Sequence, residues 1–176
     1  MTPPVDFPAQ EYGQVATPEY INAVAAAVED HDAVLRGAYA VLTRTTDYPV
    51  AAGAEVPIPW QAIATATPGT ADLANYPMRL TVPAAGTYVV SAAFALQDTS
   101  TGLMRAAHIR LSGGIWLADQ RYNALPSNHA PFTLTAEFDA TPGAYVEVLV
   151  FHGAAGPLNF LAAGAVPARF SLRRVR

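Results

Sequence analysis

The sequence predicts an all-β fold: a two-sheet antiparallel jelly-roll sandwich of about eight strands, preceded by one N-terminal helix and an extended arm. Three observations lead to this prediction. From residue 38 to the end of the chain, short apolar segments follow one another, separated by Pro and Gly corners. Helical periodicity occurs in one segment that precedes them, residues 18–37. Finally, RLTVPAAGTYVVSAAFAL (79–96) has no charged residue after its first, which is typical of a strand covered on both faces.

The composition predicts that copies of this chain cover part of its surface. Hydrophobic residues make up 52% of the 176 residues and charged residues only 14%, which is a small share for a fully solvated surface. The net charge of -4 comes without a basic stripe, so nucleic acid is not expected as a partner. No uninterrupted apolar run is long enough to cross a bilayer, so membrane insertion is not expected either.

Residues 1–17 are predicted to form an extended N-terminal anchoring arm. Three prolines interrupt any regular element there, and the segment has no periodicity. Phe7 and Tyr12 are unusual in a solvated tail. Two arrangements account for them: the arm docks on a neighbouring protein, or it folds back onto its own domain.

Residues 18–37 are predicted to form a helix, with Thr17 as its N-cap, Pro18 at its first position and Gly37 as its stop. Its apolar positions are alternately three and four residues apart, which is the spacing of a coiled-coil seam. The seam consists of Ile21, Val24, Val28, His31 and Leu35. This pattern predicts a short oligomeric coiled-coil stalk, which the family resemblance described below implies to be trimeric. The alternative is an amphipathic helix that packs on the sheet of its own chain.

The run EDHD in this helix contains residue types that bind metals, but the geometry argues against a metal site. Glu29 and Asp32 share one helix face, whereas His31 points toward the seam, so the three side chains do not converge. His31 is interpreted instead as a polar layer in a three-helix core, a device that fixes register at some cost in stability.

The jelly-roll domain is predicted to span residues 38–176, with about eight strands. Gly113-Gly114 predicts a two-residue hairpin turn between two of the strands. The segments interpreted as strands are, in order, AYAVLTRTT, AEVPIPWQAI, MRLTVP, GTYVVSAAFAL, LMRAAHIRLS, IWLADQRY, PFTLTAEFDA, AYVEVLVFHG and ARFSLRRVR.

The central strand, residues 86–96, presents two different faces. Tyr88, Val90 and Phe94 share one face and are expected to pack on the partner sheet or in a trimer contact. The other face carries small residues, which would allow a second subunit to approach closely. Those small residues are Val89, Ser91, Ala93 and Ala95.

No enzymatic activity and no cofactor or metal is expected. The chain has no cysteine, no Gly-x-Ser-x-Gly elbow and no Gly-rich phosphate loop. His108, His129 and His152 are scattered over different segments.

Two long segments, 65–77 and 118–131, are predicted to be loops at the ends of the sandwich, where such folds present binding surfaces. The second is the candidate ligand loop, because its polar and aromatic residues suit a ligand such as a glycan; plain solvated loops are the alternative. The candidate ligand residues are Arg121, Tyr122, Asn123, Asn128 and His129.

Several segments, taken in order, resemble the tumour-necrosis-factor-like and complement-globular-head jelly rolls. They are IPWQAI (58–63), RLTVPAAGTYVVSAAF (79–94), HIRLSGG (108–114), TLTAEFDATPGAYVEVLVFHG (133–153) and the terminal ARFSLRRV. The Pro-x-x-Gly-x-Tyr corner is Pro83, Gly86 and Tyr88. The chain departs from the family at Gly143-Ala144, where Gly-Asp is frequent.

Similar domains are frequent in bacteriophage minor tail, fibre and head-decoration proteins, commonly as homotrimers with an N-terminal tether. The resemblance therefore implies a homotrimeric virion component of minor tail or fibre type. It would attach to other virion proteins through residues 1–17 and contact the host surface, for example a glycan. The alternatives are a capsid decoration or head-fibre protein and a free carbohydrate-binding module.

Overall fold

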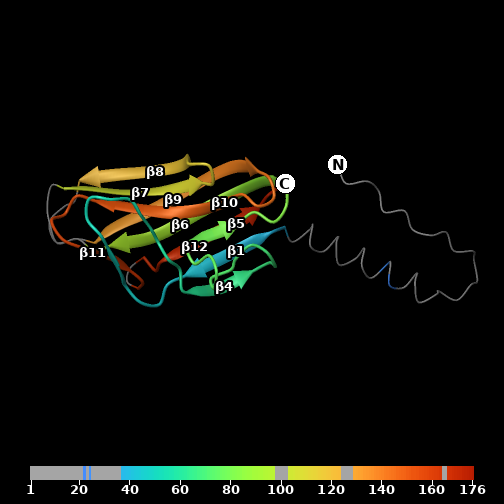
Figure 1. The fold of residues 1–176 in the computed structure, drawn as a ribbon, viewed down its shortest axis with the longest axis horizontal. Coiled ribbons are helices and arrows are strands. Elements are labelled where there is room, and N and C mark those ends of the chain that lie inside the picture. Colours follow the sequence, from blue (N-terminus) through green and yellow to red (C-terminus); the bar gives the residue numbers. More distant parts are fainter. Residues whose placement is uncertain (1–21, 23, 25–36, 98–102, 124–128, 164–165) are drawn as a thin grey trace, which may run out of the picture. The chain divides into compact units, whose positions relative to one another are not determined.

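Two antiparallel sheets pack face to face in residues 38–176 (Figure 1). In the computed structural model, the described residues are 37–97, 103–123, 129–163 and 166–176, together with Asn22 and Val24. Met1–Gly37 form a separate unit. Asn22 and Val24 are helical, and the rest of the predicted arm and helix, apart from Gly37, lies outside the described residues. The trimeric seam and the polar layer at His31 thus stay predictions.

Each sheet is built from strands that lie far apart in the sequence. The seven-stranded sheet contains β1 (Tyr39–Thr43), β2 (Tyr48–Val50), β4 (Ala62–Ala66), β6 (Gly86–Leu96), β9 (Ala130–Ala140), β11 (Leu158–Leu161) and β12 (Arg169–Arg174). The five-stranded sheet contains β3 (Val56–Pro57), β5 (Arg79–Thr81), β7 (Met104–Leu111), β8 (Ile115–Asn123) and β10 (Tyr145–His152).

The predicted two-sheet antiparallel sandwich is confirmed. β6, β9 and β12 belong to one sheet while β7, β8 and β10 belong to the other, so the chain crosses repeatedly between sheets, which is compatible with a jelly roll. The described residues contain twelve strands rather than about eight. The difference arises from very short strands at the sheet margins, such as β3 with its 2 residues.

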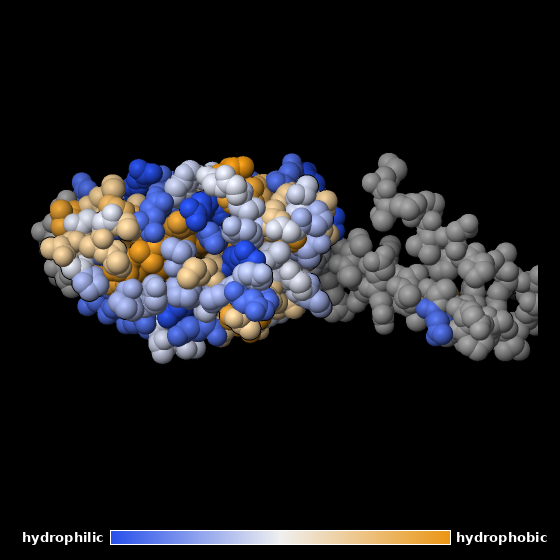
Figure 2. Space-filling model, viewed as in Figure 1, coloured by the Kyte–Doolittle hydropathy of each residue, from blue (hydrophilic) through white to orange (hydrophobic). Residues whose placement is uncertain are grey.

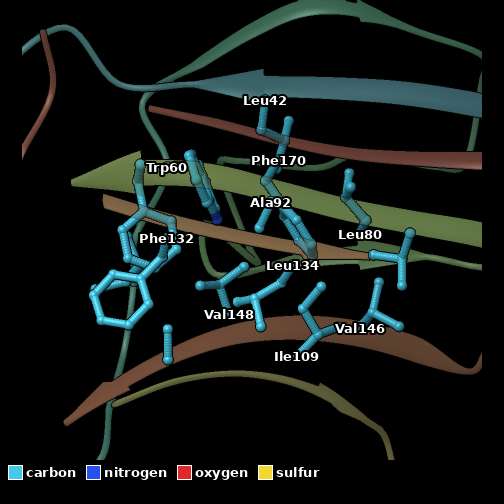
Figure 3. Close-up of a cluster of buried hydrophobic side chains, with 14 of the residues drawn as sticks. Leu42, Trp60, Leu80, Ala92, Ile109, Phe132, Leu134, Val146, Val148 and Phe170 are labelled. Carbon is cyan, nitrogen blue, oxygen red and sulfur yellow. The ribbon is translucent and has the colours of Figure 1, made fainter. Parts of the chain in front are cut away.

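β6 is the central strand of its sheet, since it pairs with β9 along its whole length and with β12 and β11 on its other side. Alternate β6 side chains enter the core between the sheets. Tyr88, Val90 and Phe94 are each 0% exposed, so these three side chains lie inside the sandwich. Figure 3 shows how the two layers meet: Ala92 and Phe170 approach Val148 and Ile109 of the opposite sheet.

Aromatic rings form a continuous row through this core. Trp60 stacks on Phe170 with ring centroids 5.4 Å apart, and its edge meets Phe160 at 5.9 Å. Phe94 stacks on Phe160 at 4.7 Å and on Phe132 at 5.2 Å. Each such pair contributes about 0.5–1.5 kcal/mol beyond the burial of its area. The four phenylalanines all come from strands of the seven-stranded sheet, so the row runs along the inner face of that sheet.

The Pro83–Tyr88 corner before β6 is held by its own side chains. The Tyr88 hydroxyl donates a hydrogen bond to the Ala84 carbonyl over 2.8 Å. A side chain at Gly86 would clash with the backbone carbonyl of Arg176, so a residue without Cβ is required where the C-terminus passes.

Candidate functional site

The outer face of the five-stranded sheet carries a polar and aromatic cluster at the β7–β8 hairpin, which runs along the top of the domain in Figure 1. The turn contains Ser112, Gly113 and Gly114, between the paired residues Leu111 and Ile115. Both glycines adopt left-handed backbone, with φ of 84° and 85°. The two-residue turn predicted from Gly113-Gly114 is therefore wrong by one residue, and the turn has three.

A β-bulge decides which β8 side chains join the cluster. Ile109 pairs with Ala118 whereas Arg110 pairs with Trp116, so Leu117 is an extra residue in β8. In a strand of strict alternation, Leu117 would point outward and Trp116 inward. Because of the extra residue, Leu117 packs against the core and Trp116 lies on the outer face.

Trp116 covers His108 of the neighbouring strand. The two ring centroids are 4.3 Å apart, with an angle of 63° between the planes, an edge-to-face contact. His108 is only 2% exposed, whereas Trp116 is 46% exposed. One part of the indole therefore buries the imidazole while another part faces solvent.

Two carboxylates flank the buried imidazole. Asp119 Oδ1 lies 3.4 Å from His108 Nδ1, and Glu55 Oε1 lies 3.8 Å from Nε2. Nδ1 is buried without a hydrogen-bond partner. Burial lowers the pKa of His108, Asp119 and Glu55 oppose this effect, and Arg121 adds a smaller lowering. The imidazole is therefore neutral at pH 7.

Arg121 and Asp119 form an exposed pair on the same strand. Arg121 Nε donates to Asp119 Oδ1 over 3.0 Å, and its Nη2 lies 2.8 Å from Oδ2. This fork geometry holds both side chains in a defined orientation. With Trp116, the pair offers one flat apolar surface, carboxylate acceptors and guanidinium donors within one small area, a combination suited to a polar ligand with hydroxyl groups.

The structure separates the predicted ligand residues. Arg121, Tyr122 and Asn123 belong to strand β8 and not to a loop, because β8 pairs with β7 up to Asn123. Arg121 is on the outer face, but Tyr122 points to the core, where its ring lies 5.0 Å from that of Phe132. His129 is exposed just before β9, and Asn128 lies outside the described residues.

Two further surface features do not form sites. An open hollow of about 370 Å³ lies near Ser112 and Asp139, but the Asp139 carboxylate already accepts a hydrogen bond of 2.6 Å from Thr87. In the 65–77 segment, Tyr76 covers the guanidinium of Arg79 at 3.5 Å, a contact that stabilises the surface. Figure 2 shows hydrophobic and hydrophilic residues intermixed over one side of the domain.

Among the described residues, no group of three His, Cys, Asp or Glu side chains could hold a metal ion. Within the same part of the chain, no helix is both long and apolar enough to span a membrane. A scan against protein-family models found no match, and a search of curated proteins found no similar sequence.

Proposed function

We propose that this chain is a bacteriophage virion structural protein, a homotrimeric minor tail or fibre-type component. It attaches to the particle through residues 1–17 and contacts the host surface with its jelly-roll domain. The tumour-necrosis-factor-like resemblance of the segments 58–63 and 79–94 and the interleaved strand order support the family part of this proposal. The role is structural and binding, without catalysis.

The observation that carries the proposal is a row of small uncharged residues across the outer face of the seven-stranded sheet. The strand register places Thr135, Ser91, Ser171, Val41 and Thr65 side by side on β9, β6, β12, β1 and β4. Ser91 and Ser171 are joined by a hydrogen bond of 2.8 Å between their hydroxyls. Such a row has few long side chains to displace, so a second copy can approach closely.

The residues beside this row carry the charge. On one side of the row, the strand register aligns Glu137, Val89 and Arg173 on β9, β6 and β12. On the other side, Ala93 of β6 pairs with Arg169 of β12. Exposed charges around an uncharged centre are typical of the rim and core of a subunit interface. The same face was expected from the sequence to admit a neighbour, because of its small β6 residues.

The solution mass of the purified full chain, measured by light scattering, tests the trimer. We expect about three times the 18.5 kDa of one chain. Thr135→Arg and Ser91→Arg should each give a monomer, because a long charged side chain would enter the uncharged centre. Asn123→Arg, which adds the same charge to the outer face of the other sheet, is the matched control and should leave the mass unchanged. A monomeric wild type would refute the proposal.

Deletion of residues 1–17 tests the attachment. The deleted chain should still form trimers but should no longer be incorporated into particles. Incorporation at the wild-type level would contradict an anchoring arm. A capsid decoration or head-fibre protein is an alternative within the same class, and labelling of the protein in intact particles distinguishes head from tail.

A free carbohydrate-binding module is the second candidate, and the exposed indole of Trp116 favours it. Such a module would bind sugars as a monomer and would need neither the arm nor the small-residue row.

A further inference from the structure

We propose that the outer face of the β7–β8 hairpin is a carbohydrate-binding site, where a neutral sugar ring stacks on Trp116 and its hydroxyls bind Asp119, Glu55 and Arg121. This inference rests on the proposed function, since it names the ligand class of the host-surface contact. It concerns the sheet opposite to the one that carries the small-residue row.

The stacking surface is the indole of Trp116, which is 46% exposed although its edge packs on His108. An aromatic face attracts the partly positive C–H groups of a sugar ring, because the ring quadrupole is negative above its plane. The second tryptophan, Trp60, is 2% exposed in the core and cannot reach a ligand. Ring stacking at this hairpin therefore falls to Trp116.

The polar partners supply both donors and acceptors. Asp119 and Glu55 are 40% and 41% exposed, and both reach the imidazole beneath Trp116. A carboxylate has about four lone-pair directions, so Asp119 can accept from hydroxyls while it holds Arg121. Arg121 has further N–H groups for a sugar oxygen.

The local charge selects among sugars. Glu55 and Asp119 carry two negative charges, whereas Arg121 carries one positive charge, which Asp119 already engages. Arg110, which pairs with Trp116 across the hairpin, is neutralised by Glu147 at 3.0 Å. An acidic sugar would bring a further carboxylate into this area and would be repelled. The site therefore fits neutral sugars and disfavours uronic acids.

Two features indicate that the cluster is a built site rather than a chance group of surface side chains. The bulge at Leu117 turns Trp116, a large apolar residue, out of the core and toward solvent. Beneath it lies His108, 2% exposed, whose Nδ1 lacks a hydrogen bond and faces Asp119 at 3.4 Å. A buried polar atom without a partner costs stability, and such costs are common where a surface serves binding.

The test is a titration of the full chain with cellotetraose, mannotetraose, N-acetylchitotetraose and tetragalacturonic acid. Binding is followed by saturation-transfer NMR and by acrylamide quenching of tryptophan fluorescence. At least one neutral tetrasaccharide should bind and protect Trp116 from acrylamide, whereas tetragalacturonic acid should not. Trp116→Ala should weaken binding about tenfold or more, as the loss of an aromatic side chain does for a stacked base of single-stranded nucleic acid.

Two variants complete the design. Asp119→Asn keeps the shape of the site and should also weaken binding, so the test does not depend on the tryptophan variant alone. Ile115→Ala is the matched control, because Ile115 is a neighbouring apolar residue that is 56% exposed and lies outside the cluster. It should leave affinity unchanged.

Failure to bind any of the four sugars, undiminished binding by Trp116→Ala, or preference for tetragalacturonic acid would overturn the proposal. Light scattering on the same samples separates the two proposals. A trimer that binds no sugar refutes this site and leaves the assembly role standing. A monomer that binds sugar refutes the trimer and leaves the site.

Discussion

The change of Gly86 to alanine tests how the C-terminus is held against the corner before β6. A Cβ at this position would clash with the Arg176 carbonyl oxygen and lie 2.6 Å from Arg174 Nε. The same segment is joined to the corner by backbone hydrogen bonds: Thr87 N donates to Arg176 O over 2.7 Å, and Val175 N donates to Thr87 O over 2.8 Å. Gly86→Ala must therefore push the end of the chain away from β6.

The size of the effect follows from these contacts. Overpacking costs about 1–3 kcal/mol, and each backbone hydrogen bond that is lost costs about 0.5–1.5 kcal/mol. We expect Gly86→Ala to lower the free energy of unfolding by about 3 kcal/mol. Gly143→Ala is the matched control, since Gly143 has φ of 85° but no atom within 4 Å of its Cβ position. Gly143→Ala should lower the free energy of unfolding by about 1–2 kcal/mol, the cost of a side chain on left-handed backbone alone.

Urea unfolding at one fixed protein concentration, followed by tryptophan fluorescence, measures both variants. A chain that lacks residues 175–176 adds a double-mutant cycle. Without the Arg176 carbonyl, Gly86→Ala should cost at least about 1 kcal/mol less than in the full chain. Equal costs for the two glycine variants, or strictly additive effects in the cycle, would refute the steric argument.

Two further predictions concern the core and the buried imidazole. Phe94→Ala should lower the free energy of unfolding by about 3–5 kcal/mol because Phe94 is 0% exposed. Phe151→Ala, at a half-buried position, should lower the free energy of unfolding clearly less. Equal urea midpoints for the two variants would contradict this prediction. Burial lowers the pKa of His108 below its ordinary value of about 6.5, so the unfolded chain binds a proton that the folded chain does not. The contribution of His108 to stability is therefore full above pH 6.5 and decreases as pH falls through that value. His108→Gln should flatten the dependence of the urea midpoint on pH between about 7.5 and 5.5. Parallel curves for the wild type and the variant would contradict a lowered pKa of His108.

The fold class could be predicted from the sequence because three features indicate packed sheets directly. They are the alternation of apolar and polar residues, the Pro and Gly corners, and the uncharged segment of β6. The alternation of TLTAEF in β9, for example, places Leu134 in the core and Thr133 and Thr135 outside, as in the structure. Short strands such as β2 were not predicted, since 3 residues carry no periodicity. The place of β2 in the sheet is decided by its pairing with the distant strand β11 and not by its own sequence.

The candidate site was only partly predictable. Arg121 was singled out as a ligand residue, and it lies in the cluster, but Tyr122 points the other way because neighbours on a strand face opposite sides. Glu55 could not be found, because it comes from the segment before β3 and meets His108 only through the fold. The polar residues of the segment 118–131 predicted a loop, whereas pairing with β7 makes residues 118–123 part of strand β8.

Trp116 shows why sequence alternation fails at such a site. Counted back from Asp119, an outward residue, strict alternation assigns Trp116 to the core and Leu117 to solvent, which also agrees with the preference of a large aromatic residue for burial. The single extra residue in β8 reverses both assignments. A bulge has little signature in one sequence, because it depends on the register with the partner strand. The residue that the local pattern would bury is thus the one that the fold exposes: one part of its indole packs on His108, and another part faces solvent.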